Sequence, residues 1–148
     1  MDKKTLVKHL HNIIDRFEKA GQPFNLVMLI PVDPGLNNKF SILWSAAWID
    51  GMTRSEAIHV LVEAIAEEMR SDDSKFEKIA RVSPLRSTDP FVTEIIEEYE
   101  VKKGSLRMPN SYINGLLVEG AIILQSTPPY LSNLIEPASS SYAQPVTS

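Results

Sequence analysis

The chain has 148 residues, 43% of them hydrophobic, which suits one domain with a sizeable core and is too short for two. It contains no cysteine, which excludes a disulfide framework, a thiolate metal site and a cysteine nucleophile. The formal net charge of −4 is modest and the basic residues are dispersed, which argues against nucleic-acid binding. No apolar run is long enough to cross a membrane and no secretory signal is apparent, so we expect a cytoplasmic protein without a membrane partner.

The first segment predicts an amphipathic helix over about Lys3 to Ala20. Gly21 stands where a residue in left-handed conformation would end this helix. Apolar residues recur at helical spacing and define one buried face: Leu6, Leu10, Ile13, Ile14 and Phe17.

Two runs that are apolar on both faces follow, Phe24 to Ile30 and Phe40 to Ile49, and they predict two interior strands. Between them, Pro31 to Lys39 contains two prolines, a glycine and paired asparagines, so we expect a turn and antiparallel pairing. Both faces of the pair need a cover. Three short helices are a small cover, so the pattern also favours an association surface.

A capping box, Thr53-Arg54-Ser55-Glu56, predicts the start of a second helix. Thr53 would accept a hydrogen bond from the Glu56 amide, and the Glu56 carboxylate would accept one from the Thr53 amide. The apolar stripe expected to pack on the strand pair consists of Ile58, Leu61, Val62, Ile65 and Met69.

The second half of the chain predicts a strand, a helix and a final hairpin. Ile79 to Arg86 alternates like a strand, and Pro84 places it at an edge or a strand end. Asp89 as cap and Pro90 at the first helical position predict a third helix. Asn114-Gly115 predicts a tight hairpin at the end of the sheet.

A last strand is expected over Ala121 to Gln125, and Gly120 before it would suit a bulge. The resulting order is α-β-β-α-β-α-β-β. It predicts an α+β fold in which about three helices pack on a mostly antiparallel sheet of about five strands.

Composition divides the chain into a single domain over residues 1–125 and a tail over residues 126–148. The tail is rich in proline and serine and predicts a largely disordered segment. Within it, Tyr130 to Ile135 is a small apolar island that could clasp back onto the domain or dock on a partner.

No arrangement of residues predicts catalysis, a cofactor or a metal. His59 and Glu63 would share a helix face, but no third ligand is apparent. Asp33 and Asp50 end different strands, at opposite ends of the expected hairpin, and both suit turns. The glycines have neither the phosphate-loop nor the dinucleotide spacing, and no Gly-x-Ser-x-Gly motif occurs.

Trp44 and Trp48, four residues apart on the expected strand, would share one face. The favoured interpretation is a core face under the first two helices, and the alternative is an aromatic surface for a partner. Candidate partner-binding residues are therefore the two tryptophans and the apolar residues of the island: Trp44, Trp48, Tyr130, Leu131, Leu134 and Ile135.

Two functions remain open. The first is a small non-catalytic binding or adaptor protein that associates with itself, as a homo-oligomer, or with a larger protein partner. The second is an enzyme or small-ligand sensor with a pocket between sheet and helices. A concave pocket would favour the second if it gathered several polar residues from strand ends and loops: Asp33, Asn37, Asn38, Lys39, Arg81 and Arg86.

Overall fold

The computed structural model describes residues 2–36, 38–72 and 76–128, and it has the expected α+β class. In chain order the elements are α1 (Lys3–Lys19), β1 (Leu26–Pro31), β2 (Phe40–Ser45), the 3₁₀ helix η1 (Ala47–Ile49), α2 (Arg54–Glu68), β3 (Ile79–Pro84), α3 (Pro90–Glu98), β4 (Leu106–Arg107), β5 (Ser111–Ile113), β6 (Leu116–Val118) and β7 (Ile122–Ser126). Among the described residues, no helix is both long enough and apolar enough to cross a membrane.

Five strands form the main sheet in the order β3-β2-β1-β7-β4. The predicted antiparallel pair is present, with Val27 opposite Trp44 and Leu29 opposite Ile42. β7 is antiparallel to both β1 and β4, whereas β3 is parallel to β2. The sheet is therefore mixed, since α2 carries the chain back before β3 begins. As predicted for a strand containing Pro84, β3 lies at a sheet edge.

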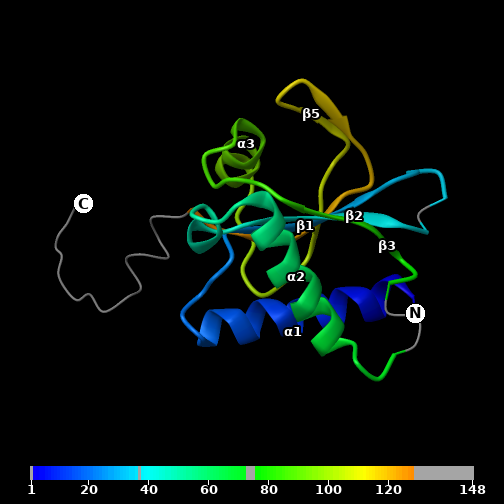
Figure 1. Ribbon diagram of the computed structural model, residues 1–148. Helices are drawn as coiled ribbons and strands as arrows, with labels where there is room; N and C mark the ends of the chain where they lie inside the picture. Colours follow the sequence, from blue (N-terminus) through cyan, green and yellow to red (C-terminus); the bar gives the residue numbers. More distant parts are fainter. Residues whose placement is uncertain (1, 37, 73–75, 129–148) are drawn as a thin grey trace, which may run out of the picture.

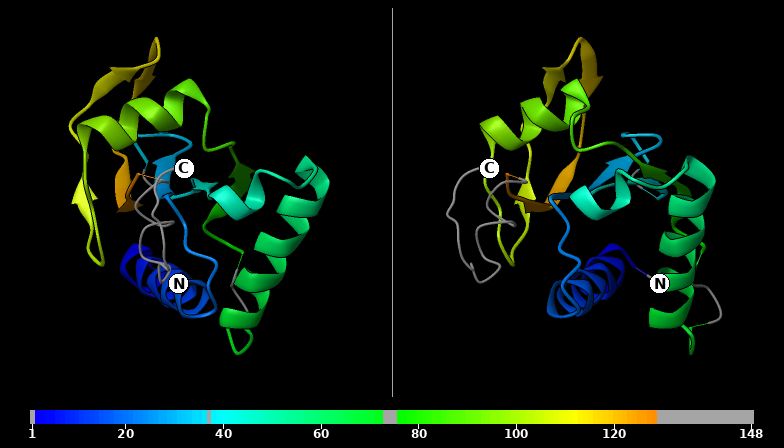
Figure 2. Two further views of the ribbon diagram at one scale, coloured as in Figure 1. Left: turned by 90° about the vertical axis from the view of Figure 1, so that its left-hand side faces the viewer. Right: turned by 60° about the vertical axis from the view of Figure 1, so that its left-hand side comes forward.

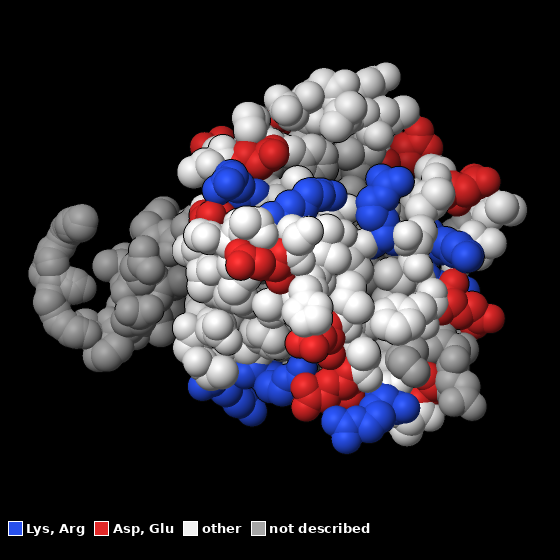
Figure 3. Space-filling model, viewed as in Figure 1, with Lys and Arg blue, Asp and Glu red and all other residues white. Residues whose placement is uncertain are grey.

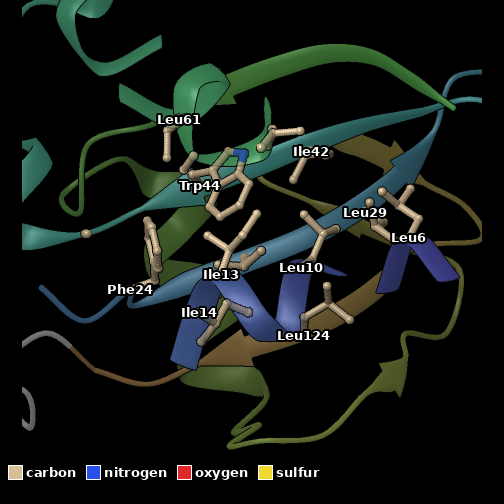
Figure 4. Close-up of a cluster of buried hydrophobic side chains, with 14 of the residues drawn as sticks. Leu6, Leu10, Ile13, Ile14, Phe24, Leu29, Ile42, Trp44, Leu61 and Leu124 are labelled. Atoms are coloured by element: carbon tan, nitrogen blue, oxygen red, sulfur yellow. The ribbon is translucent and has the colours of Figure 1, made fainter. Parts of the chain in front are cut away.

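The sheet is the middle of three layers (Figures 1 and 2). Helices α1 and α2 cover one face, and their core includes Leu10, Leu61 and the sheet residue Trp44 (Figure 4). On the opposite face, α3 and the β5–β6 hairpin pack over Met28 and Ile123. Both apolar faces of the central strands thus have a cover within the chain.

The hairpin prediction is correct for the turn and wrong for its place in the sheet. Asn114 and Gly115 have φ values of 51° and 81°, as the expected tight turn requires. However, β5 and β6 form a separate two-stranded sheet, and β7 lies in the main sheet between β1 and β4. Local turn chemistry determines the hairpin, but it does not determine where the following strand is inserted.

The expectation that the second strand reaches Ile49 is wrong. β2 ends at Ser45, and Trp48 lies in the short helix η1. The side chain of Asn25 accepts a hydrogen bond from the Ala47 amide at 3.1 Å, just where the extended run stops. Because Asn25 is distant in the sequence, the local pattern did not reveal this end.

The strand irregularity in β7 also differs from the expectation. Val27 pairs with Gln125 while Met28 pairs with Ile123, so Leu124 is the extra residue. Gly120 instead has a φ of 70° before β7, and a Cβ there would lie 3.2 Å from the Pro31 ring. This position thus combines a left-handed backbone with close packing.

The predicted helix ends are confirmed. Thr53 Oγ1 accepts a bond from the Glu56 amide at 3.1 Å, and Glu56 Oε1 accepts one from the Thr53 amide at 2.9 Å. Asp89 accepts a bond from the Phe91 amide, and Gly21 follows α1 with a φ of 81°. The buried face of α2 is rotated slightly from the predicted stripe: Ala57, Leu61, Ala64, Ile65 and Met69 are buried, whereas Ile58 and Val62 are partly exposed.

The paired backbone continues beyond Gln125, where the folded domain was expected to end. The Thr127 amide donates to the Asn25 carbonyl at 2.8 Å, and Ser126 Oγ donates to the Tyr99 carbonyl at 2.7 Å. Residues 129–148 lie outside the described part of the chain, and the predicted disordered tail and apolar island fall within them.

Candidate functional site

Trp44, one of the candidate partner-binding residues, is fully buried in the core under α1 and α2. Its ring centroid lies 5.0 Å from that of Phe24. Trp44 is therefore a core residue, as the favoured interpretation predicted, and it presents no aromatic surface on the described fold.

Trp48 is partly buried at the end of the same core. Its ring stacks on Phe17 with centroids 5.6 Å apart, and its Nε1 donates to the Pro23 carbonyl at 3.0 Å. Both interactions join η1 to the end of α1 and the loop before β1. The other candidates, Tyr130, Leu131, Leu134 and Ile135, lie outside the described residues.

The paired histidine and carboxylate residues do not gather into a larger cluster. His59 and Glu63 form the expected (i, i+4) contact at 3.3 Å, with both side chains about 70% exposed. His9 contacts Glu68, whereas His11 contacts Ser105 Oγ at 3.2 Å. Within the described ranges, no three His, Asp or Glu side chains are placed to hold a metal ion.

Two adjoining hollows lie along the end of β3. The first, here called the helix-end pocket, has a volume of about 480 Å³ and lies where η1, α2, β3 and α3 meet. Its polar lining includes Asp50, Arg54, Arg86 and Asp89. Its apolar lining consists of Ile49, Met52, Ala57, Pro84, Leu85 and Pro90.

Both carboxylates of the helix-end pocket are held by hydrogen bonds within the fold. Asp50 accepts bonds from the amide of Ser87, at 2.9 Å, and from its hydroxyl. Asp89 caps α3. Asp50 thereby ties the end of η1 to the loop before α3. The sequence predicted only a turn role for this residue.

The two arginines of this pocket are exposed and contact backbone carbonyls rather than carboxylates. Arg86 Nη1 donates to the Asp50 carbonyl at 2.9 Å, and Arg54 Nη1 lies 3.5 Å from the Pro84 carbonyl. Neither forms an ion pair with a described carboxylate. The amino-terminal ends of α2 and α3 add partial positive charge at the same place. The Asp50 and Asp89 carboxylates lie in the same lining, so the pocket presents charges of both signs.

The second hollow, here called the hairpin groove, has a volume of about 460 Å³ and lies between strands β2 and β3 and the β5–β6 turn. Apolar lining residues are Ile30, Leu43, Leu85, Phe91 and Leu116. Arg81, Ser41 and Ser83 supply polar groups from the sheet. Leu85 and Asp89 line both hollows, so the two are adjacent.

On the face shown in Figure 3, basic side chains lie in a row across the upper half of the molecule. Acidic side chains lie above and below this row (Figure 3). Charges of both signs are thus mixed on this face, without an extended surface of one sign.

The hairpin carries a concentration of exposed apolar side chains. Tyr112 and Leu117 pair across the strands on its outer face and are 70% and 52% exposed. Leu116, beside the groove, is 61% exposed. These are three of the six large apolar side chains that are exposed among the described residues, so their grouping on six strand residues exceeds ordinary scatter.

The strand-end polar residues proposed for an enzyme pocket do not meet. Arg81 lies in the hairpin groove and Arg86 in the helix-end pocket. Asp33 Oδ1 accepts a hydrogen bond from the Gly35 amide within its own turn. Asn38 and Lys39 are exposed before β2. Asn37 lies outside the described residues. The described members of this set therefore do not form one polar pocket.

Sequence reasoning missed Arg54 and the grouping of Tyr112, Leu116 and Leu117. Arg54 stands inside a capping box, where its own side chain gives no signal of a pocket. The three apolar residues lie in short strands, where they resemble core residues.

Comparison with protein-family models, curated proteins and solved structures finds no match to the chain.

Proposed function

We propose that the chain is a small non-catalytic binding protein that associates with a second copy of itself through the β5–β6 hairpin. The observation that carries this proposal is the exposed apolar outer face formed by Tyr112 and Leu117. The inner face of the same hairpin is occupied, because Ile113 and Val118 are buried against the second core.

The surroundings of the hairpin support association. A ribbon of three residues per strand is marginal by itself, so its inner packing holds the outer face in a defined orientation. The hairpin groove beside Leu116 adds apolar depth, and Arg81 adds a charged group at its wall. Apolar centre and polar rim are the usual components of a protein–protein interface.

Single cysteines provide a direct test, because the natural chain has none. If Leu117 lies near the two-fold axis of the dimer, Leu117→Cys should form a disulfide-linked dimer under mild oxidation, because a residue near that axis meets its own copy. Leu36→Cys, at another exposed leucine, serves as the matched control and should remain monomeric. Light scattering on the unmodified chain should give a dimer mass.

A double change, Tyr112→Ser with Leu117→Ser, should lower that mass to a monomer while leaving the melting temperature nearly unchanged. The matched control is Val32→Ser with Leu36→Ser, which removes two exposed apolar side chains from the loop between β1 and β2. A monomeric natural chain, or equal cross-linking at positions 36 and 117, would contradict self-association at the hairpin.

A further inference from the structure

We infer that the segment from Tyr130 to Glu136 docks in the helix-end pocket of its own domain. The first support is the position of the chain exit. Ser126 pairs with Leu26, Leu26 pairs with Ser45, and the neighbouring Trp44 pairs with Pro84. β7 therefore ends at the same end of the sheet as β2 and β3, where the pocket lies.

The second support is reach. β3 is three strands away from β7 in the sheet, and strand separations of about 4.8 Å make this about 14 Å. An extended chain advances about 3.3 Å per residue, so the four steps from Thr127 to Leu131 cover up to about 13 Å. A helical segment from Leu131 to Ile135 adds about 6 Å, at about 1.5 Å per residue. The segment is thus long enough to cross the sheet end and enter the pocket.

The third support is chemical complementarity. Leu131, Leu134 and Ile135 stand at positions i, i+3 and i+4, a spacing that gathers apolar side chains on one side of a short helical segment. Part of the pocket lining is also apolar and includes Ile49, Met52 and Leu85. Recognition of an apolar stripe by a groove is a common mode of peptide binding.

Charge also matches. Glu136 is the only charged residue in the sequence from 129 to 148 and directly follows Ile135. Arg54 and Arg86 line the pocket without a carboxylate partner among the described residues. One carboxylate placed after the apolar residues would meet these two guanidinium groups. The Asp50 and Asp89 carboxylates in the same lining are already held by hydrogen bonds from Ser87 and from the Phe91 amide.

Docking within one molecule requires little intrinsic affinity, because a short connection gives an effective concentration in the millimolar range. The docked segment would fill the helix-end pocket and extend toward Leu85, which also lines the hairpin groove. The interaction involves neither Tyr112 nor Leu117 and does not rest on association of the hairpin.

A spin label on Ser132→Cys of the full chain tests the docking. Paramagnetic broadening should be strongest at the amides of Ile49, Thr53 and Leu85, and weak at Tyr112 and Leu117. The same experiment on a mixture of labelled ¹⁴N chains and unlabelled ¹⁵N chains should show little broadening. Broadening in the mixture would assign the segment to the pocket of a second copy and overturn docking in its own domain.

Substitutions separate specific docking from random contact. Leu134→Ser with Ile135→Ser should abolish the broadening at the pocket, while Tyr142→Ser, beyond the segment, should leave it unchanged. Glu136→Gln, and separately Arg54→Gln with Arg86→Gln, should each reduce the docked population several-fold. Absence of broadening in the full chain, broadening centred elsewhere, or equal broadening after the double serine change would overturn the inference.

Discussion

Two adjacent side chains in the core, Trp44 and Ser45, each bury a polar atom that has no hydrogen-bond partner within the described residues. Trp44 Nε1 belongs to a large ring whose packing outweighs the cost of one unpaired donor. Ser45 Oγ brings no comparable packing, so its burial without a partner reduces stability.

Ser45→Ala is therefore expected to leave the free energy of unfolding unchanged or raise it by about 1 kcal/mol. Ser126→Ala is the matched control, because Ser126 is equally buried but its Oγ donates to the Tyr99 carbonyl. That change should lower the free energy of unfolding by about 1 kcal/mol. Urea unfolding followed by circular dichroism measures both, and destabilisation by Ser45→Ala would show that the hydroxyl is satisfied.

His11 gives the fold a pH dependence. Burial lowers the pKa of His11 below its ordinary value of 6.5, against the opposing charge of Asp15. Below about pH 6.5 the unfolded chain then binds more protons at this position than the folded chain. The stability contributed by neutral His11 is complete above pH 6.5 and is lost as the pH falls through the lowered pKa.

The natural chain should consequently lose more stability between about pH 7.5 and about pH 5 than His11→Gln does. Urea midpoints at the two pH values give the comparison. His59→Gln is a suitable control, because His59 is 71% exposed. An equal loss of stability in the natural chain and in His11→Gln would argue against a lowered pKa.

At the scale of elements, Glu68 connects the two helices that cover one face of the sheet. Its carboxylate, at the end of α2, accepts a bond from Asn12 at 2.9 Å and contacts His9 at 3.1 Å and Arg16 at 3.7 Å. The Glu68 side chain is only 14% exposed. It thus fixes how α2 lies against α1.

Glu68→Ala should lower the free energy of unfolding by roughly 1.5–3 kcal/mol, because several polar groups of α1 lose their acceptor. Glu67→Ala, next to it, should cost less than about 1 kcal/mol, since Glu67 pairs with Arg70 on the surface. Thermal or urea unfolding of the two variants provides the measurement. Similar costs for both changes would mean that the contacts around Glu68 add little.

Element ends were predictable where the deciding residues are close in sequence. Thr53 with Glu56, Asp89 with Pro90, and Asn114 with Gly115 each form the expected local structure. The end of β2 was not predictable, because it depends on the side chain of Asn25. The apolar pattern also indicated the buried faces of the first helix and of the central strands, because burial follows directly from hydrophobicity.

At the scale of the whole molecule, the order of the strands could not be predicted from the sequence. Neither the parallel pairing of β3 nor the insertion of β7 beside β1 leaves a local signature, since both depend on packing between distant segments. The candidate site could not be predicted for the same reason, because it also depends on packing between distant segments. Arg81 and Arg86 were named as pocket residues only for the alternative of an enzyme or ligand sensor. The two hollows that they line arise only when η1, α2, α3 and the hairpin surround the end of β3.

Local stability against opening should differ between the main sheet and the β5–β6 hairpin. β1 and β7 each have a strand on both sides and contribute to both cores, whereas β5 and β6 pair only with each other. We expect amide hydrogen exchange to be slowest in β1 and β7 and several orders of magnitude faster in the hairpin. Equal protection in β1 and in the hairpin would mean that the whole described fold opens as one unit.

The place of β7 between β1 and β4 determines when a newly made chain can fold. On the ribosome, β1, β2 and β3 emerge early, but one edge of β1 remains open until residue 126 has left the exit tunnel. During that interval the nascent chain exposes an apolar strand edge that could pair with other chains. Chaperones that bind extended apolar segments would therefore act on this protein mainly before β7 has emerged and paired with β1.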